Sequence, residues 1–155
     1  MSSDAMHAIH AAIPHREPFL FVDRIVERAE GRLVTEWDVP AQAPFFRGHY
    51  PGNPLVPGVL ICESAFQAGA ILCAGDAPDA LSDGAVPVLT KIGDARFKRT
   101  ARPGETLRCE VVLDERLGTA RYMTAKVTCE GETVLRIEFV VAVVPAAATG
   151  ASKGS

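Results

Sequence analysis

The sequence predicts an α+β domain in which a curled antiparallel sheet of six strands surrounds one long helix. Two observations carry this prediction. Strand-like segments joined by short turns follow one another along much of the chain, which favours antiparallel pairing between neighbours. The segment from Pro57 to about Ala74 is apolar on every face, so it must be buried on every face. The sheet can cover most of this helix, and a second copy of the chain would cover the rest.

The first elements are a short helix and a β-hairpin. The helix is expected over residues 4–12, because Pro14 stops it. Apolar and β-branched residues indicate a strand over 19–27 and a partner strand over 32–39. Gly31 lies between the two strands at a turn, which makes a hairpin the expected pairing.

The second half of the chain changes to a strand pattern after the long helix ends near Asp76. Turns that contain glycine separate the strand-like segments. The four strands are expected over residues 86–100, 106–115, 121–129 and 133–144. Six strands and one long helix therefore account for most of the chain.

Length and composition indicate a single globular domain. We assign residues 1–145 of the 155 to it and expect the small and polar residues 146–155 to form a disordered tail. Apolar residues make up 48% and charged residues 23%, which is ordinary for a globular protein. A net charge of -3 gives no indication of nucleic-acid binding. Polar residues interrupt every long apolar run and no leader pattern opens the chain, so we expect a cytoplasmic protein without membrane insertion.

Residues 40–58 break all periodicity between the predicted hairpin and the long helix. This stretch holds five prolines and three glycines. Long ordered loops in compact domains are usually functional, because ordering them is costly. Prolines reduce that cost by restricting the unfolded chain. A stiff loop can hold a side chain in one pose, and this loop contains His49.

His49 and Glu63 are the candidate acid–base pair. Burial in the apolar helix would raise the pKa of Glu63, as a general acid near neutral pH requires. A neutral His49 imidazole can accept a proton. The N–H groups of Gly58 and Val59 are unpaired at the positive end of the helix and could bind an oxygen that becomes negative. These groups together suit removal of a proton next to a carbonyl, followed by loss of a β-hydroxyl as water.

Each of the two residues also has an ordinary interpretation. A single glutamate in a helix more often lies on a solvated strip, here with Ser64 and Gln67. A single histidine in a loop is more often a hydrogen-bonded structural residue. The surrounding sequence favours the catalytic interpretation of both.

Three motifs resemble the FabZ-type 3-hydroxyacyl-acyl-carrier-protein dehydratases. The longest is FFRGHYPGNPLVPGVLICE at residues 45–63, and the similarity continues to residue 68. Upstream, IPHREPFLFVDR at 13–24 is similar to the N-terminal motif of that family. Downstream, ARFKR at 95–99 followed by PGE at 103–105 matches in kind and spacing. The resemblance covers nearly the whole chain apart from the tail.

The resemblance implies a hot-dog fold that works as a homodimer or a trimer of dimers, without a cofactor. The substrate would be a (3R)-3-hydroxyacyl group carried on the phosphopantetheine of acyl carrier protein, in fatty acid or related lipid or polyketide biosynthesis. His49 would abstract the α-proton, and Glu63 of the partner subunit would act on the departing hydroxyl. The Gly58 N–H would hold the thioester carbonyl, and Gln67 would orient Glu63. Glutamate rather than aspartate at position 63 favours dehydration without isomerisation.

Other residues carry weaker predictions. Phe66 departs from the family pattern and could narrow the acyl tunnel. The basic residues Arg96, Lys98, Arg99 and Arg102 form either a solvated strand face or a docking patch for an acidic carrier. His15 and its neighbour Arg16 are expected to be structural, through hydrogen bonds that hold the N-terminal segment on the sheet.

The four cysteines are expected to be buried free thiols, and no metal site is predicted. Cys62 and Glu63 are adjacent and diverge on the helix, so they would not bind one metal with His49.

Two alternative functions keep the same fold. One is an acyl thioesterase, which would release free thiol and leave no unsaturated product. The other is a non-catalytic acyl-binding accessory subunit. The pairing of His49 with a buried Glu63 argues against the second alternative, because binding alone does not need a buried acid.

Overall fold

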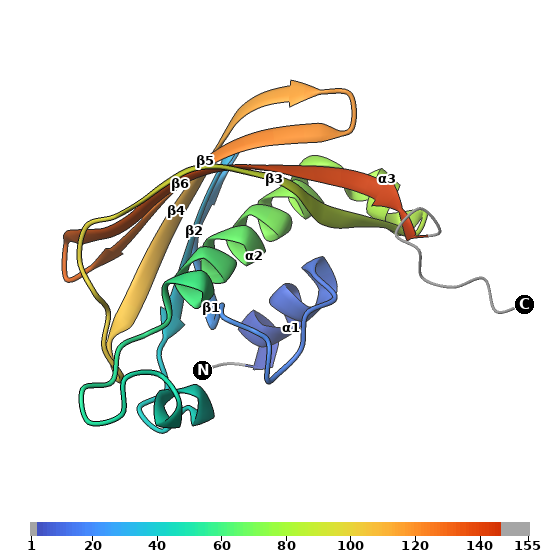
Figure 1. Cartoon of the computed structure of the whole chain (residues 1–155). Helices are drawn as coiled ribbons and strands as arrows, with labels where there is room; N and C mark the ends of the chain where they lie inside the picture. The colour runs from blue at the N-terminus through green and yellow to red at the C-terminus, as the bar shows by residue number, and fades with distance from the viewer. Residues whose placement is uncertain (1–2, 147–155) are drawn as a thin grey trace, which may run out of the picture.

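The computed structural model describes residues 3–146 (Figure 1), and it confirms the predicted α+β class. The helices are α1 (Ser3–Ala12), α2 (Gly58–Asp76) and α3 (Pro78–Ser82), with a short 3-10 helix at Pro44–Arg47. The strands are β1 (Arg24–Ala29), β2 (Arg32–Asp38), β3 (Ala85–Phe97), β4 (Thr106–Leu117), β5 (Ala120–Cys129) and β6 (Glu132–Pro145).

The six strands form one antiparallel sheet in the order β1-β2-β4-β5-β6-β3. The predicted hairpins β1–β2, β4–β5 and β5–β6 are all present. The strand after α2, β3, crosses to the far edge and pairs with β6. Figure 1 shows the sheet curving over α2, with α1 on the other side of that helix. A curled sheet around one long helix is the architecture that the resemblance implied.

Helix α2 is the core of the fold. Every residue from Ser64 to Ala74 is buried, which agrees with a helix that is apolar all round. The helix approaches the sheet closely at Gly69. A Cβ atom there would lie 2.5 Å from the Phe139 ring and 3.0 Å from the sulfur of Met123. Glycine is therefore the residue that allows this packing distance.

The length and hydropathy of α2 also meet the test for a membrane-spanning helix. Its most apolar 18-residue window has a mean hydropathy of 1.5, even though polar residues such as Glu63 and Gln67 interrupt it. However, 61% of that window is buried inside the protein. The sheet and α1 cover this helix, and its apolar surface is explained by the core.

The segment before β1 differs from the prediction. Residues 19–23 were expected to be strand, but β1 begins only at Arg24. The backbone of Phe21 is bonded by side chains of α2 instead: Gln67 Oε1 accepts its N–H at 2.8 Å, and Ser64 Oγ donates to its carbonyl at 2.9 Å. The side chains of α2 therefore hold this segment up to Phe21, and backbone pairing with β2 starts only at Asp23, whose N–H donates to the carbonyl of Glu36 at 2.8 Å.

The remaining differences are at element ends. The strand expected over 86–100 ends at Phe97, and α2 continues to Asp76. The side chain of Asp76 accepts hydrogen bonds from Arg116 and Arg121, which ties the end of α2 to the β4–β5 hairpin. Apart from Ala146, the predicted tail lies outside the described residues, and the assignment of residues 1–145 to a single domain stays a prediction.

Candidate active site

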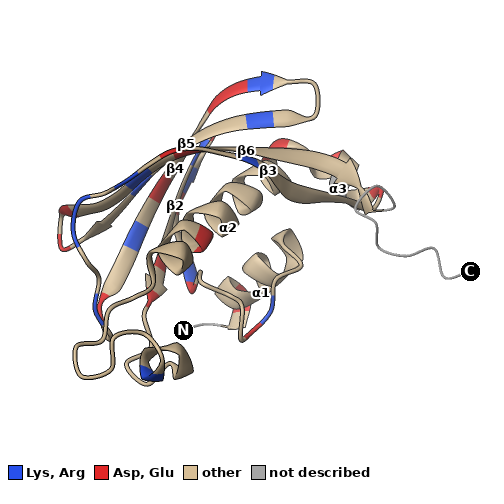
Figure 2. Cartoon of the chain, viewed as in Figure 1, with Lys and Arg blue, Asp and Glu red and all other residues tan. Residues whose placement is uncertain are grey.

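Glu63 lies near the start of α2, before the fully buried part of the helix, and its side chain is 21% exposed. Figure 2 shows that α2 carries hardly any charge along its length. Burial raises the pKa of the Glu63 carboxyl above its ordinary value, although a hydrogen bond from Gln67 opposes that shift. A half-buried carboxyl of this kind can hold a proton nearer to neutral pH than an exposed one.

Gln67 holds Glu63 from the next turn of the helix. Its Nε2 donates to Glu63 Oε2 at 3.0 Å and to the carbonyl of Phe19 at 3.1 Å. The orientation of the amide follows from its other bond, because only Oε1 can accept the N–H of Phe21. Both amide protons are therefore committed, and one of them faces Glu63 Oε2. The contact by which Gln67 could orient Glu63 is in place.

His49 lies in the long loop, between the 3-10 helix and α2. Its Nδ1 is 2.9 Å from the carbonyl oxygen of Leu55. Since a carbonyl can only accept, the proton of a neutral His49 is on Nδ1, and Nε2 is free to accept another proton. The ring also packs edge-on against Tyr50, with 4.8 Å between ring centroids. These two contacts fix the orientation of the imidazole, and its role as a base stays a prediction.

The N–H groups of Gly58 and Val59 open α2. The carbonyl of Pro57 accepts from Leu60 and Ile61, whereas the first two N–H groups make no hydrogen bond within the part of the chain that the structure describes. They lie at the positive end of a 19-residue helix. This arrangement leaves two donors available for a developing oxyanion, and the oxyanion role stays a prediction.

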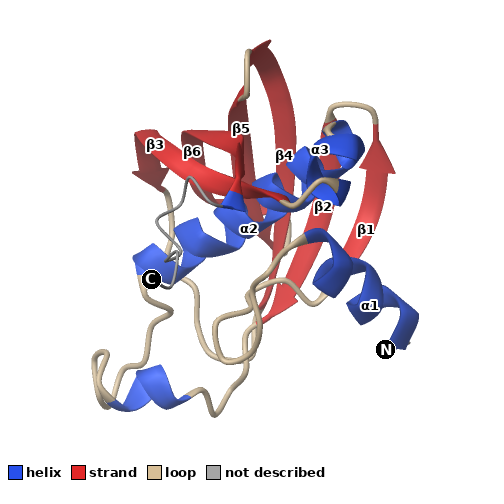
Figure 3. Ribbon diagram, turned by 90° about the vertical axis from the view of Figure 1, so that its right-hand side faces the viewer, coloured by secondary structure: helices blue, strands red, loops and turns tan. Residues whose placement is uncertain are grey.

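His49 and Glu63 make no direct polar contact within the described residues 3–146. No hydrogen bond or ion pair joins them among the described residues. Figure 3 shows the loop that carries His49 extending beyond the start of α2, away from the sheet. A site that uses both side chains, with one of them supplied by a second subunit, stays a prediction.

The basic cluster is largely paired within the chain. Arg96 bonds Asp94 at 2.8 Å, and Arg99 bonds Glu105 at 2.6 Å. Arg102 donates to the side chain of Asn53 at 3.1 Å. These local partners favour a structural interpretation of Arg96 and Arg99 over a docking patch, and the docking role stays a prediction.

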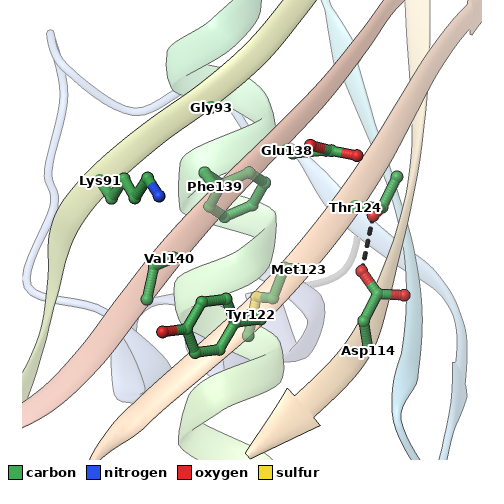
Figure 4. A pocket seen from close by; sticks show the side chains of 9 residues that line it. All are labelled: Lys91, Gly93, Asp114, Tyr122, Met123, Thr124, Glu138, Phe139 and Val140. Carbon is green, nitrogen blue, oxygen red and sulfur yellow. Dashed lines mark hydrogen bonds between the residues drawn. The ribbon is translucent and has the colours of Figure 1, made fainter.

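Phe66 points into the core, where its ring packs edge-on against Phe139 at 5.1 Å. A pocket of about 160 Å³ lies on the sheet beside Phe139 (Figure 4), and Thr124 donates to Asp114 in its wall at 2.6 Å. Its lining includes Lys91 and none of the predicted site residues, so this pocket is separate from the candidate chemistry. An acyl tunnel beside Phe66 stays a prediction.

The cysteines are free thiols, as expected. Cys73, Cys109 and Cys129 are buried, and Cys62 is partly buried. The thiol of Cys129 donates to Glu105, the carboxylate that also binds Arg99.

His15 is the site residue whose position the sequence interpretation missed. It was expected to be structural, and that role stays a prediction, but the expectation did not include its closeness to Glu63, whose Oε2 lies 3.7 Å from the Nε2 of His15. The hydrogen bonds of its neighbour Arg16 do not reach the sheet as expected, because its guanidinium donates to carbonyls at the end of α1 and just after it. The only signal in the sequence was that both residues fall in a motif shared with the family.

Comparisons with known proteins agree on one family. A model of the FabA-like domain matches residues 13–138. The chain is 44% identical over 140 residues to the 3-hydroxyacyl-acyl-carrier-protein dehydratase FabZ of Chloroflexus aggregans, covering 86% of this chain and 95% of that protein. It is 43% identical over 127 residues to the FabZ of Herpetosiphon aurantiacus, covering 81% and 88%.

Solved structures show the same fold at low sequence identity. The dehydratase heterocomplex ApeI:P from Xenorhabdus doucetiae superimposes with a TM-score of 0.76 at 14% identity, covering 90% of this chain and 92% of that one. The PaaI protein of E. coli gives a TM-score of 0.64 at 18% identity, covering 91% of each chain.

Proposed function

The chain belongs to the FabA-like domain family, and from this premise we propose that it is a 3-hydroxyacyl-acyl-carrier-protein dehydratase. The enzyme removes water from a (3R)-3-hydroxyacyl thioester and leaves a trans-2-enoyl thioester. The observation that carries the proposal is the half-buried Glu63, whose pKa is raised and whose Oε2 is held by Gln67. The chain also matches curated dehydratases over most of its length.

The reaction assigns one step to each group. His49 Nε2 takes the proton from the α-carbon, and the C–H electrons form the new double bond as the β-carbon–oxygen bond breaks. Glu63 gives its proton to the departing hydroxyl, which leaves as water. The Gly58 N–H, assisted by that of Val59, binds the thioester oxygen while it carries negative charge. Proton exchange with solvent then returns His49 and Glu63 to their starting forms.

A homodimer with shared active sites fits this chemistry. Support comes from the lack of any hydrogen bond or ion pair between His49 and Glu63 among the described residues, and from apolar residues near the unpaired edge of the sheet. Ile92 and Phe97 on β3 are 55% and 50% exposed, and Val59 at the start of α2 is 75% exposed. A second copy packed on this edge would cover these side chains and bring His49 of one subunit to Glu63 of the partner subunit. A measurement of molecular mass in solution distinguishes a dimer from a trimer of dimers.

The natural substrate is carried by acyl carrier protein, as the names of the relatives state for those enzymes. We propose that the acyl group is held on the phosphopantetheine arm of that carrier. We place the enzyme with its carrier in the cytoplasm. Arg102 and Lys98 are the members of the basic cluster with no ion pair to a carboxylate among the described residues, so they are the better candidates for contact with an acidic carrier.

A panel of 3-hydroxyacyl thioesters of different chain length, on pantetheine and on carrier, tests the proposal. Dehydration produces the ultraviolet absorbance of an α,β-unsaturated thioester and no free thiol. Release of free thiol without the unsaturated product would identify a thioesterase instead. Tight binding without any product, across the whole panel, would identify an accessory subunit.

A further inference from the structure

His15 lies beside Glu63, and the reaction described above does not use it. His15 belongs to the loop between α1 and β1, and its Nε2 is 3.7 Å from Glu63 Oε2. The other ring nitrogen, Nδ1, is buried and has no hydrogen-bond partner within residues 3–146. One nitrogen of this imidazole therefore faces a carboxylate, and the other faces no polar group.

The contrast between the two nitrogens determines which one carries the proton. A neutral imidazole has a single N–H, and a buried N–H without an acceptor loses its hydrogen bond to water with no replacement. The proton is therefore on Nε2, directed toward Glu63. Burial, and then the positive charge of Arg16, lower the pKa of His15, so the ring is neutral at neutral pH.

Two sets of hydrogen bonds fix His15 in this position. On one side, the Arg16 guanidinium donates to the carbonyls of His10, Ile13 and His15 at 3.0, 2.9 and 2.7 Å. On the other side, Gln67 and Ser64 hold the chain just after it through the backbone of Phe19 and Phe21. The same amide, Gln67, thus binds both Glu63 and the segment that carries His15.

We propose that His15 is a positioning residue for Glu63, a role that rests on the proposed dehydratase function. Its Nε2–H and the Gln67 amide both face Oε2, which leaves Oε1 as the oxygen that carries the proton to the substrate hydroxyl. The separation of 3.7 Å is longer than a hydrogen bond. A small side-chain rotation brings Nε2–H within hydrogen-bond distance of Oε2 in the free enzyme, and the contact can tighten further in the substrate complex.

Few charged or titratable groups lie close to His15 and Glu63. Among the described residues, Glu63 interacts with His15 and lies next to the thiol of Cys62, and His15 interacts with Glu63 and Arg16. In the proposed dimer, His49 of the partner subunit joins them. Because His15 is neutral, its N–H stabilises the ionised form of Glu63, and loss of that N–H raises the carboxyl pKa.

Carbon-13 NMR of glutamate-labelled protein measures this effect without any need for activity. The Glu63 carboxyl signal is identified by its loss in Glu63→Gln and is titrated in wild type, His15→Phe and His15→Gln. His15→Phe keeps a ring and removes the N–H, so the Glu63 pKa rises. His15→Gln restores a donor and moves the pKa back toward the wild-type value. His15→Ala provides a second variant without a donor if the phenylalanine ring does not fit.

Kinetics provide the second measurement. In His15→Phe, kcat falls on the order of 10- to 100-fold with little change in KM, and the loss of activity at high pH moves to higher pH. His7→Phe, the same change at an exposed position of α1, leaves kcat and the pH profile unchanged. An unchanged Glu63 pKa in the variants without a donor overturns the positioning role, as does a lower kcat with an unmoved pH profile. If wild type turns over no thioester, the dehydratase proposal fails, and the NMR titration still decides the role of His15.

Discussion

Gln67 donates a hydrogen bond from Nε2 to Oε2 of Glu63, one turn earlier on α2, at a distance of 3.0 Å. The orientation of the Gln67 amide is set from outside the helix, by the backbone N–H of Phe21. The position of the candidate acid therefore depends on a contact between α2 and the loop before β1. This relationship leads to the first prediction.

Replacement of Gln67 by leucine should lower the free energy of unfolding and also raise the pKa of the Glu63 carboxyl. The change leaves the buried N–H of Phe21 unpaired, which costs about 1–3 kcal/mol of the free energy of unfolding. It also removes a hydrogen bond that lowers the pKa of Glu63. Urea unfolding and the pH profile of kcat measure the two effects. Gln42→Leu, the same change in an exposed loop, is the control and should alter neither.

The charge on Glu63 should make the protein less stable as pH rises. Its folded pKa is raised by burial, so the stability it contributes is fully present below the unfolded pKa and is lost as pH rises through the folded pKa. Glu63→Gln removes this loss. The variant should gain stability over wild type on going from pH 4 to pH 8, as measured by urea unfolding. Asp23, whose pKa is also raised by burial, titrates in both proteins and cancels in the difference. A difference that does not change with pH would show that the carboxyl is not perturbed.

Gly69→Ala should destabilise the core, although alanine favours helices. The new Cβ would lie 2.5 Å from the ring of Phe139, so the helix or the ring must shift, at a cost of about 1–3 kcal/mol. Gly75→Ala in the same helix is the matched control. There the nearest atom is the flexible end of Arg28, and stability should be unchanged or should rise by up to about 1 kcal/mol. Thermal unfolding of both variants measures how much stability depends on the close approach at Gly69, and equal effects at the two positions would contradict this account.

Asp76→Asn should weaken the junction between α2 and the β4–β5 hairpin. Asp76 and Arg121 are 11% and 13% exposed, so loss of the carboxylate leaves a poorly hydrated guanidinium, and we expect a loss of about 1–3 kcal/mol. The arginines lower the pKa of Asp76, with the Arg116 hydrogen bond the larger cause. The stabilisation is therefore present above the unfolded pKa and disappears as pH falls through the folded pKa.

The exposed pair between Arg96 and Asp94 supplies the control for that experiment. These side chains are 66% and 59% exposed, so Asp94→Asn should cost less than about 1 kcal/mol. Equal effects at positions 76 and 94 would contradict the role assigned to burial.

The fold was predictable because its two patterns are local. A helix that is apolar on all faces and strands separated by glycine turns are visible in the sequence without knowledge of the partners. The segment at 19–23 was assigned wrongly for the opposite reason. An extended loop and a strand show the same apolar residues, and what distinguishes them here is a hydrogen bond from Phe21 to Gln67, which is 46 positions further along the chain.

Within the candidate site, the contacts that depend on one helix were predictable from the sequence. Glu63 and Gln67 are four positions apart in one helix, so their contact follows from helical geometry. The unpaired N–H groups of Gly58 and Val59 follow from the position of the helix start. The approach of His15 to Glu63 does not follow in this way, because it depends on how the loop after α1 packs on α2. The proposed contact of His49 with Glu63 involves a second chain, so it could not follow from the fold of one chain.

Mixing two inactive variants tests the shared site most directly. His49→Ala and Glu63→Ala should each form dimers without dehydratase activity. When equal amounts are unfolded together and refolded, half of the dimers contain one of each chain, and each of those has one site with both residues intact. The mixture should therefore recover roughly a quarter of the wild-type rate on a 3-hydroxyacyl thioester. A mixture that forms mixed dimers and remains inactive would contradict an active site built from His49 of one subunit and Glu63 of the other.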